Sequence, residues 1–372
     1  MTIEQSRGAD DLEDALIDGD VAFARGTAQA AFRNRNFRIC YLGAFASNIG
    51  TWMQNVLLGA YAYDLTHSST FVGVLFFAQL GPLLFLSSIG GLLADVVDRR
   101  RLLVSLQCAQ GLLSLVLAAL VAASDHPSKF ALAGIVFAIG IANALSAPGL
   151  SAILPTLVPR EDLPGAVALM SVQMNLSRVI GPAIGAAIYS QLGAPPVFVI
   201  NAATYLFAVA GLLLAQYARR VGAVVDERGF ARLVSGFRIA RAEPLVRTLL
   251  GMLFTFSFFS LTFVGLMPVL ADKNLAIAPK SVAYGLLYAA FGLGAALGAV
   301  SVGTVFARYA KVRLLRPGFI AFAVLLGAFS LLRSPGPAYP VALLLGYAYF
   351  AVITSMSTVL QSYVRDAVRG RV

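Results

Sequence analysis

Long apolar stretches separated by short polar segments run through the chain from residue 39 onward. A helix needs about 20 apolar residues to cross a bilayer, because every backbone polar group must be paired within the segment. Ten stretches reach that length, so the pattern predicts an all-α membrane protein with ten transmembrane helices. They cover roughly 39–63, 70–93, 102–123, 130–156, 164–191, 195–217, 246–271, 281–307, 314–333 and 338–363.

The composition favours a membrane protein over a soluble one. Hydrophobic residues make up 59% of the 372 positions and charged residues only 12%, whereas a soluble domain averages about 45–50% and about 25%. So few charges could not cover a soluble fold of this length, and the excess apolar surface must face lipid. The net charge of +10 comes from loops between apolar stretches, so no nucleic-acid partner is expected.

The basic residues indicate an orientation. Of the 28 lysines and arginines, 23 fall on the side of the predicted spans that holds the N-terminus, four fall on the other side, and Arg178 lies within a span. Cytoplasmic loops of membrane proteins carry an excess of basic residues. We therefore expect a multi-pass membrane protein with its N-terminus in the cytoplasm, and the resemblance described below implies a bacterial cytoplasmic (inner) membrane.

Four segments are predicted. Residues 1–36 form a cytoplasmic N-terminal tail, whose acidic start is unlike a signal peptide. Residues 37–217 form a six-helix bundle, and residues 246–372 form a C-terminal bundle with four helices. The connection 218–245 is expected to be a cytoplasmic amphipathic linker, because Phe230, Leu233, Val234 and Phe237 recur at helical spacing beside arginines.

An internal repeat relates the two bundles. The segments Gly91–Leu103 and Gly303–Leu315 are similar, lie 212 residues apart and each follow a predicted span. Two parallel halves of six helices account for this spacing. The second half then has only four of its six helices, and the last two are interpreted as missing from a truncated chain.

One loop carries a recognisable motif. Gly91, Asp95, Asp98, Arg99 and Arg100 lie between the second and third spans and resemble the signature of the major facilitator superfamily, with Asp98 where a second glycine is usual. Gly50–Gln54, Tyr63–Thr66 and Leu154–Glu161 resemble a subgroup of that family, which contains the enterobactin exporter, macrolide efflux proteins and transmembrane secretion effectors. The resemblance implies the major facilitator fold of two six-helix bundles, transport by alternating access, and no cofactor.

The motif predicts a gate, and Gly91 is expected to allow close helix approach. Asp95 and Asp98 beside the arginines would form a charge latch between helix ends that holds one conformation. Ordinary loop charge is the alternative.

The fifth predicted span carries a second motif. Gly181, Pro182 and Gly185 resemble the antiporter motif of drug and metabolite exporters, and this resemblance favours export. Arg178 lies one turn earlier and should face the bundle interior or a wet cavity, because a charge in lipid is unfavourable. A role in substrate binding or coupling and a role as a structural anchor both stay open.

Polar residues of the first span mark a candidate cavity. Asn48, Thr51, Trp52 and Asn55 lie on or beside one helical face, and Asn175 shares a face with Arg178. Such residues line a cavity or form hydrogen bonds between helices, and the sequence leaves both interpretations open.

The expected function is secondary active export of a small amphipathic molecule, such as a siderophore, a macrolide or another metabolite. Proton coupling is implied by the resemblance alone, and Asp64, near the outer end of the first span, is the candidate proton site. No metal is expected, because Cys40 and Cys108 belong to no ligand cluster. The protein is expected to be a monomer and to have no enzymatic activity. The alternative is a truncated or partner-dependent membrane protein without independent transport activity.

Overall fold

The computed structural model describes residues 26–217 and 244–363. The first 25 residues of the expected tail and nearly all of the expected amphipathic linker lie outside the described residues. Residues 28–33 and 35–36, which were also assigned to the tail, belong to α2 (Ala28–Arg33) and to the first turn of α3, with the extended Asn34 between them. Thr27 caps α2 by accepting a hydrogen bond from the backbone of Ala30 at 3.2 Å.

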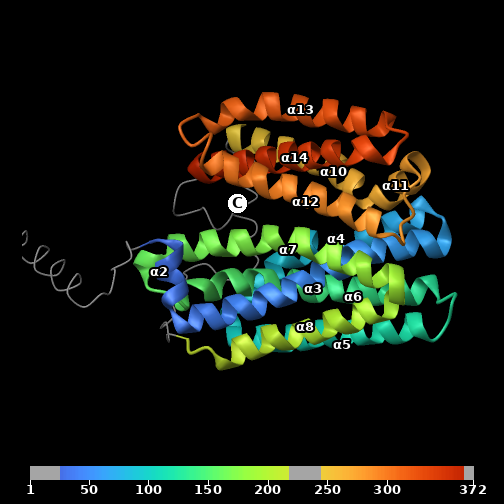
Figure 1. Cartoon of the computed structure of the whole chain (residues 1–372). Helices are drawn as coiled ribbons and strands as arrows, with labels where there is room; N and C mark the ends of the chain where they lie inside the picture. The colour runs from blue at the N-terminus through green and yellow to red at the C-terminus, as the bar shows by residue number, and fades with distance from the viewer. Residues whose placement is uncertain (1–25, 218–243, 364–372) are drawn as a thin grey trace, which may run out of the picture.

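Six long helices form the N-terminal half (Figure 1). They are α3 (Arg35–Thr66), α4 (Ser69–Val96), α5 (Arg99–Ala122), α6 (Lys129–Ile153), α7 (Leu163–Leu192) and α8 (Ala194–Leu214). Two short 3-10 helices, η1 (Leu154–Thr156) and η2 (Arg160–Asp162), connect α6 to α7. Within this half α3 packs against α7 and α8, and α4 packs against α6.

The C-terminal half contains α10 (Pro244–Gly265), α11 (Met267–Leu275), α12 (Val282–Gly303), α13 (Lys311–Leu331) and α14 (Pro335–Tyr363). One predicted span, 246–271, is wrong in detail, because α10 ends at Gly265 and the short helix α11 begins at Met267. Pro268 lies in the first turn of α11. Proline has no N–H to donate and disfavours helical geometry at the preceding residue, so it favours a helix start there.

Eight of the helices in the described ranges are long and apolar enough to cross a membrane. The helices α3 and α7 contain 32 and 30 residues but are not among these eight. Both carry polar residues along their middle, such as Gln54 and Arg178, and both are surrounded by other helices. The expected all-helical membrane fold is therefore confirmed, whereas the count of ten spans stays a prediction.

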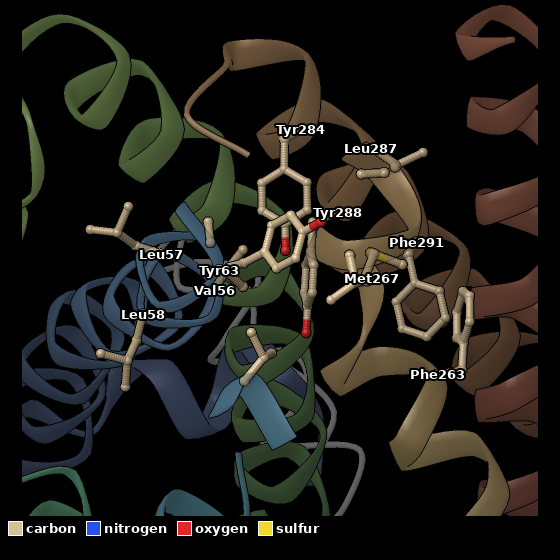
Figure 2. Packing of buried hydrophobic residues seen from close by; sticks show 14 of the residues in the cluster. Val56, Leu57, Leu58, Tyr63, Phe263, Met267, Tyr284, Leu287, Tyr288 and Phe291 are labelled. Carbon is tan, nitrogen blue, oxygen red and sulfur yellow. The ribbon is translucent and has the colours of Figure 1, made fainter. Parts of the chain in front are cut away.

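The two halves share a hydrophobic core. Figure 2 shows Tyr288 of α12 between Val56 of α3 and Met267 of α11. Large apolar side chains such as Phe85, Phe207 and Val324 are exposed on the outside of the helices, as expected for a surface that faces lipid.

The helices end in two layers of connections. The arginine-rich end holds Arg35, Arg38, Arg99–Arg101, Arg160, Arg308 and Arg313, and the arginine-poor end holds the connections around His67, Gly193, Ala276 and Leu332. In Figure 1 α2 lies at the arginine-rich end and α11 at the arginine-poor end.

Candidate functional site

Arg178 of α7 lies where the two halves meet. Its guanidinium carbon is 4.9 Å from the ring centroid of Trp52 in α3 and 4.3 Å from that of Phe350 in α14. Cations are attracted to the faces of aromatic rings, and the attraction grows where water is displaced. One side chain therefore contacts aromatic rings of both halves.

The polar contacts of Arg178 are few. Its Nη1 donates a hydrogen bond of 3.4 Å to Oδ1 of Asn175, while its Nε is buried without a hydrogen-bond partner in the described ranges. The acidic residues of the described ranges all lie at or near helix ends, namely Asp64, Asp95, Asp98, Asp125, Glu161, Asp162 and Asp272.

Glycines hold α7 tightly between α3 and α12. A Cβ atom on Gly181 would lie 2.7 Å from the carbonyl oxygen of Ile49 in α3. On α12, a Cβ atom on Gly292 would lie 2.8 Å from the carbonyl oxygen of Arg178. The antiporter-like motif of Gly181, Pro182 and Gly185 thus lies beside the boundary between the halves.

The candidate cavity residues make different contacts in the structure. Trp52 and Asn175 both contact Arg178. The Thr51 hydroxyl lies 3.3 Å from that of Tyr205 in α8, so Thr51 joins two helices of the same half. Asn48 and Asn55 are half-buried, and within the ranges that the structure describes no hydrogen bond holds their side chains. Their place in a cavity stays a prediction.

A buried polar cluster lies inside the N-terminal half. Oε1 of Gln54 accepts hydrogen bonds from Ser114 Oγ at 3.0 Å and from Asn201 Nδ2 at 2.8 Å. These three residues come from α3, α5 and α8, and all three are almost fully buried. Gln54 was not among the predicted cavity residues, and its partners lie 60 and 147 residues away, so local spacing could not reveal them.

The expected gate motif lies at the arginine-rich end. Asp98 caps α5 by accepting a hydrogen bond of 2.8 Å from the backbone of Arg101. Arg99 donates to the carbonyl of Ala152 at 3.5 Å, and Arg100 donates to the carbonyl of Leu213. These contacts join α5 to the ends of α6 and α8 within one half. A charge latch that controls conformation stays a prediction.

The prediction that Gly91 allows close helix approach is wrong. Gly91 has open space where a Cβ would stand, whereas a Cβ on Gly90 would lie 2.9 Å from the Cα of Leu145 in α6. Close approach of α4 to α6 is therefore permitted by Gly90. Asp95 lies in the last turn of α4.

Further contacts join the halves at the arginine-poor end. Tyr63 of α3 donates a hydrogen bond of 3.1 Å to Asp272 of α11. Nζ of Lys280, which precedes α12, lies 5.8 Å from the ring centroid of Tyr189 in α7. The Tyr189 hydroxyl donates in turn to Asp64 at 3.1 Å. Asp64 is exposed there and does not lie at the level of Arg178.

Comparison with known proteins agrees with this architecture. The family model described as transmembrane secretion effector matches residues 26–372. The enterobactin exporter EntS of Escherichia coli O1:K1 is 30% identical over 352 residues, which cover 90% of this chain and 79% of that protein. EntS of Shigella boydii serotype 4 is also 30% identical with the same coverage.

Solved structures show the same fold. A bacterial homologue of the human lysosomal transporter Spinster, in an inward-facing and unoccupied conformation, superposes with a TM-score of 0.69 at 17% identity, covering 90% of this chain and 77% of that one. The nucleoside transporter NupG gives a TM-score of 0.66 at 12% identity, with 91% and 85% covered. The chain belongs to the transmembrane secretion effector family of the major facilitator superfamily, a family of multi-pass membrane transporters.

Proposed function

We propose that this protein is a secondary active exporter that moves a small amphipathic molecule out of a bacterial cell by alternating access. The observation that carries the proposal is the position of Arg178, whose guanidinium lies between Trp52 of one half and Phe350 of the other. A site at the boundary between two halves is exposed to either side of the membrane in turn when the halves rock against each other.

All ten long helices, including α3 and α7, cross the membrane in this proposal, with the arginine-rich end in the cytoplasm. The position of α3 and α7 supports their crossing, because apolar helices around them shield their polar residues from lipid. The excess of basic residues at one end supports the orientation.

The arrangement corresponds to a state that is open towards the cytoplasm. The contacts described between the halves lie at the level of Arg178 or at the arginine-poor end, as with Tyr63 and Asp272 or Lys280 and Tyr189. At the arginine-rich end, Arg99 donates to the carbonyl of Ala152 and Arg100 to that of Leu213. They are placed to form the gate when that end closes.

The cargo class follows from similarity and from the site. The relatives named EntS export enterobactin, and we extend only the general class, a siderophore, macrolide or similar metabolite, to this chain. The aromatic rings of Trp52 and Phe350 beside a cation suit a molecule that is partly aromatic and partly polar. Protons are the proposed coupling ion, and Asp64 is the proposed proton site.

An efflux assay tests this function. Cells that express the chain are loaded with a panel of fluorescent siderophore and macrolide analogues, and retention is followed with and without an uncoupler. We expect faster loss of at least one compound, and Arg178→Ala should abolish the gain while the amount of protein in the membrane is unchanged. Equal retention of every compound in expressing and empty cells would contradict the proposal.

A further inference from the structure

We infer that Arg178 is an anion-binding residue that takes the carboxylate of an aromatic cargo molecule at the boundary between the halves. The inference deepens the proposed function, on which it rests, because it names the chemical class that the site recognises. It also explains why a cation is kept within a transmembrane bundle.

The first argument is the missing counter-charge. A buried charge is stabilised by an opposite charge, by hydrogen bonds or by the faces of aromatic rings, and of these only the opposite charge neutralises it. Arg178 has one hydrogen bond, to Asn175, and its buried Nε has no acceptor in the described ranges. The described carboxylates lie near helix ends. An anion that arrives from outside the protein would supply the opposite charge and accept hydrogen bonds from the guanidinium.

The second argument is geometry. The rings of Trp52 and Phe350 lie near the guanidinium at 4.9 and 4.3 Å, so its N–H edge is the direction left for a ligand. A guanidinium presents its N–H groups as a planar fork that matches the two oxygens of a carboxylate. A neutral hydroxyl or amide would leave the charge uncompensated.

The third argument is access. Arg178, Trp52, Asn175 and Phe350 are half-buried, whereas Tyr349, whose ring centroid lies 5.0 Å from that of Phe350, is buried. Ser171, two turns from Arg178 towards the arginine-rich end, is exposed. A ligand therefore reaches the cation from that end and stacks its ring against Trp52 or Phe350. The phosphate of a membrane lipid shares the anionic chemistry, and the test separates these two sources.

The chain offers its own reporter, because Trp52 is its single tryptophan. The full-length protein in phosphatidylcholine nanodiscs is titrated with benzoate and with the neutral isostere benzamide, and tryptophan emission is followed. We expect saturable change with benzoate at a concentration roughly tenfold or more below that needed for benzamide, as for a charge-assisted hydrogen bond. Equal responses of the wild-type protein to both probes would overturn the inference without any variant.

Variants identify the residue. In Arg178→Gln the two titrations should coincide, and Arg178→Lys should keep part of the preference for benzoate because it keeps the charge. Arg333→Gln is the matched control and should behave as wild type, since the hydrogen bonds of Arg333 within the described ranges go to the carbonyls of Ser330 and Leu332 at the arginine-poor end. A preference for benzoate that survives in Arg178→Gln would overturn the assignment.

Nanodiscs that contain phosphatidylglycerol distinguish a lipid from cargo. We expect the benzoate titration to be unchanged in these nanodiscs. If phosphatidylglycerol removed the benzoate response that depends on Arg178, the ligand would be the headgroup of an anionic lipid, and the cargo assignment would be overturned. Efflux is measured separately. Retained efflux without anion preference would overturn only this inference, and anion preference without efflux would overturn only the proposed function.

Discussion

Tyr63 of α3 and Asp272 of α11 join the two halves of the transporter through a hydrogen bond of 3.1 Å at the arginine-poor end. Tyr63 is buried, and Asp272 is half-buried. The bond can exist only while this end is closed, since its two groups belong to different halves. Its removal therefore has a directional effect on conformation.

Tyr63→Phe should shift the protein towards the state that is open at the arginine-poor end. A hydrogen bond to a half-buried carboxylate contributes about 1 kcal/mol, which is roughly a fivefold change in the equilibrium. Spin labels at His67 and Lys273, in a background without Cys40 and Cys108, would report a larger population of long distances. Tyr61→Phe on the same helix should leave the distance distribution unchanged.

Gly292→Ala should disturb the site through the backbone. The added methyl would lie 2.8 Å from the carbonyl oxygen of Arg178, so α7 and α12 must separate. We expect a loss of about 1–3 kcal/mol in the free energy of unfolding, as for overpacking, together with lower efflux. Gly251→Ala, where the methyl meets open space, is the control. Equal stability of the two variants in thermal unfolding would refute the close-packing argument.

Gln54→Leu should destabilise the N-terminal half by removing the acceptor of Ser114 and one of the two acceptors of Asn201, whose Nδ2 also donates to Ser114 Oγ at 3.3 Å. Buried donors without partners cost about 1–3 kcal/mol in soluble proteins, and measured values within membranes are lower, on average about 0.6 kcal/mol. A double-mutant cycle with Ser114→Ala, followed by urea unfolding in detergent, would measure the coupling. Additive effects of the two changes would mean that the hydrogen bond contributes nothing.

Asp64→Asn should uncouple export from the proton gradient if Asp64 is the proton site. The amide cannot be ionised, while its oxygen can still accept the hydrogen bond from Tyr189. Proteoliposomes should then show cargo exchange without acceleration by an imposed pH gradient. Asp125→Asn, an exposed carboxylate at the same end, is the control. Unchanged acceleration in Asp64→Asn would move the proton site elsewhere.

Orientation can be tested with single cysteines in the same cysteine-free background. Lys280→Cys should react with a membrane-impermeant maleimide added to intact cells, while Arg160→Cys should react only after lysis. Both positions lie in connections at opposite ends of the helices. The reverse labelling pattern would invert the proposed direction of transport.

The helices could largely be predicted because a membrane imposes one length and one composition on each of them. Each predicted span contains a long helix in the structure. The break at Leu266, the short helix α2 and the 3-10 turn at Leu154–Thr156 were missed, and α8 and α12 end three and four residues earlier than predicted. Pro268 is typical of a helix start, but the apolar stretch continues on both sides of it, so the hydrophobic pattern alone does not indicate where the preceding helix ends.

The site was only partly predictable. The charge of Arg178 in an apolar segment marked it, and helical spacing placed Asn175 beside it. The face shared by Thr51 and Trp52 did not reveal that one contacts α8 and the other contacts Arg178. Phe350 lies 172 positions from Arg178 in the sequence. Contacts between distant segments depend on how whole helices rotate, which local periodicity does not specify.

The close packing of Gly292 against the backbone of Arg178 limits how the two halves can move. If the two halves rotate as rigid bodies about this central contact, residues at both ends of the helices move far, while residues at the contact move little. Tyr63 and Arg99 lie towards the two ends of the helices, and Arg178 lies at the central contact. The cargo would then stay in place during the cycle, and the membrane face that it meets would change around it.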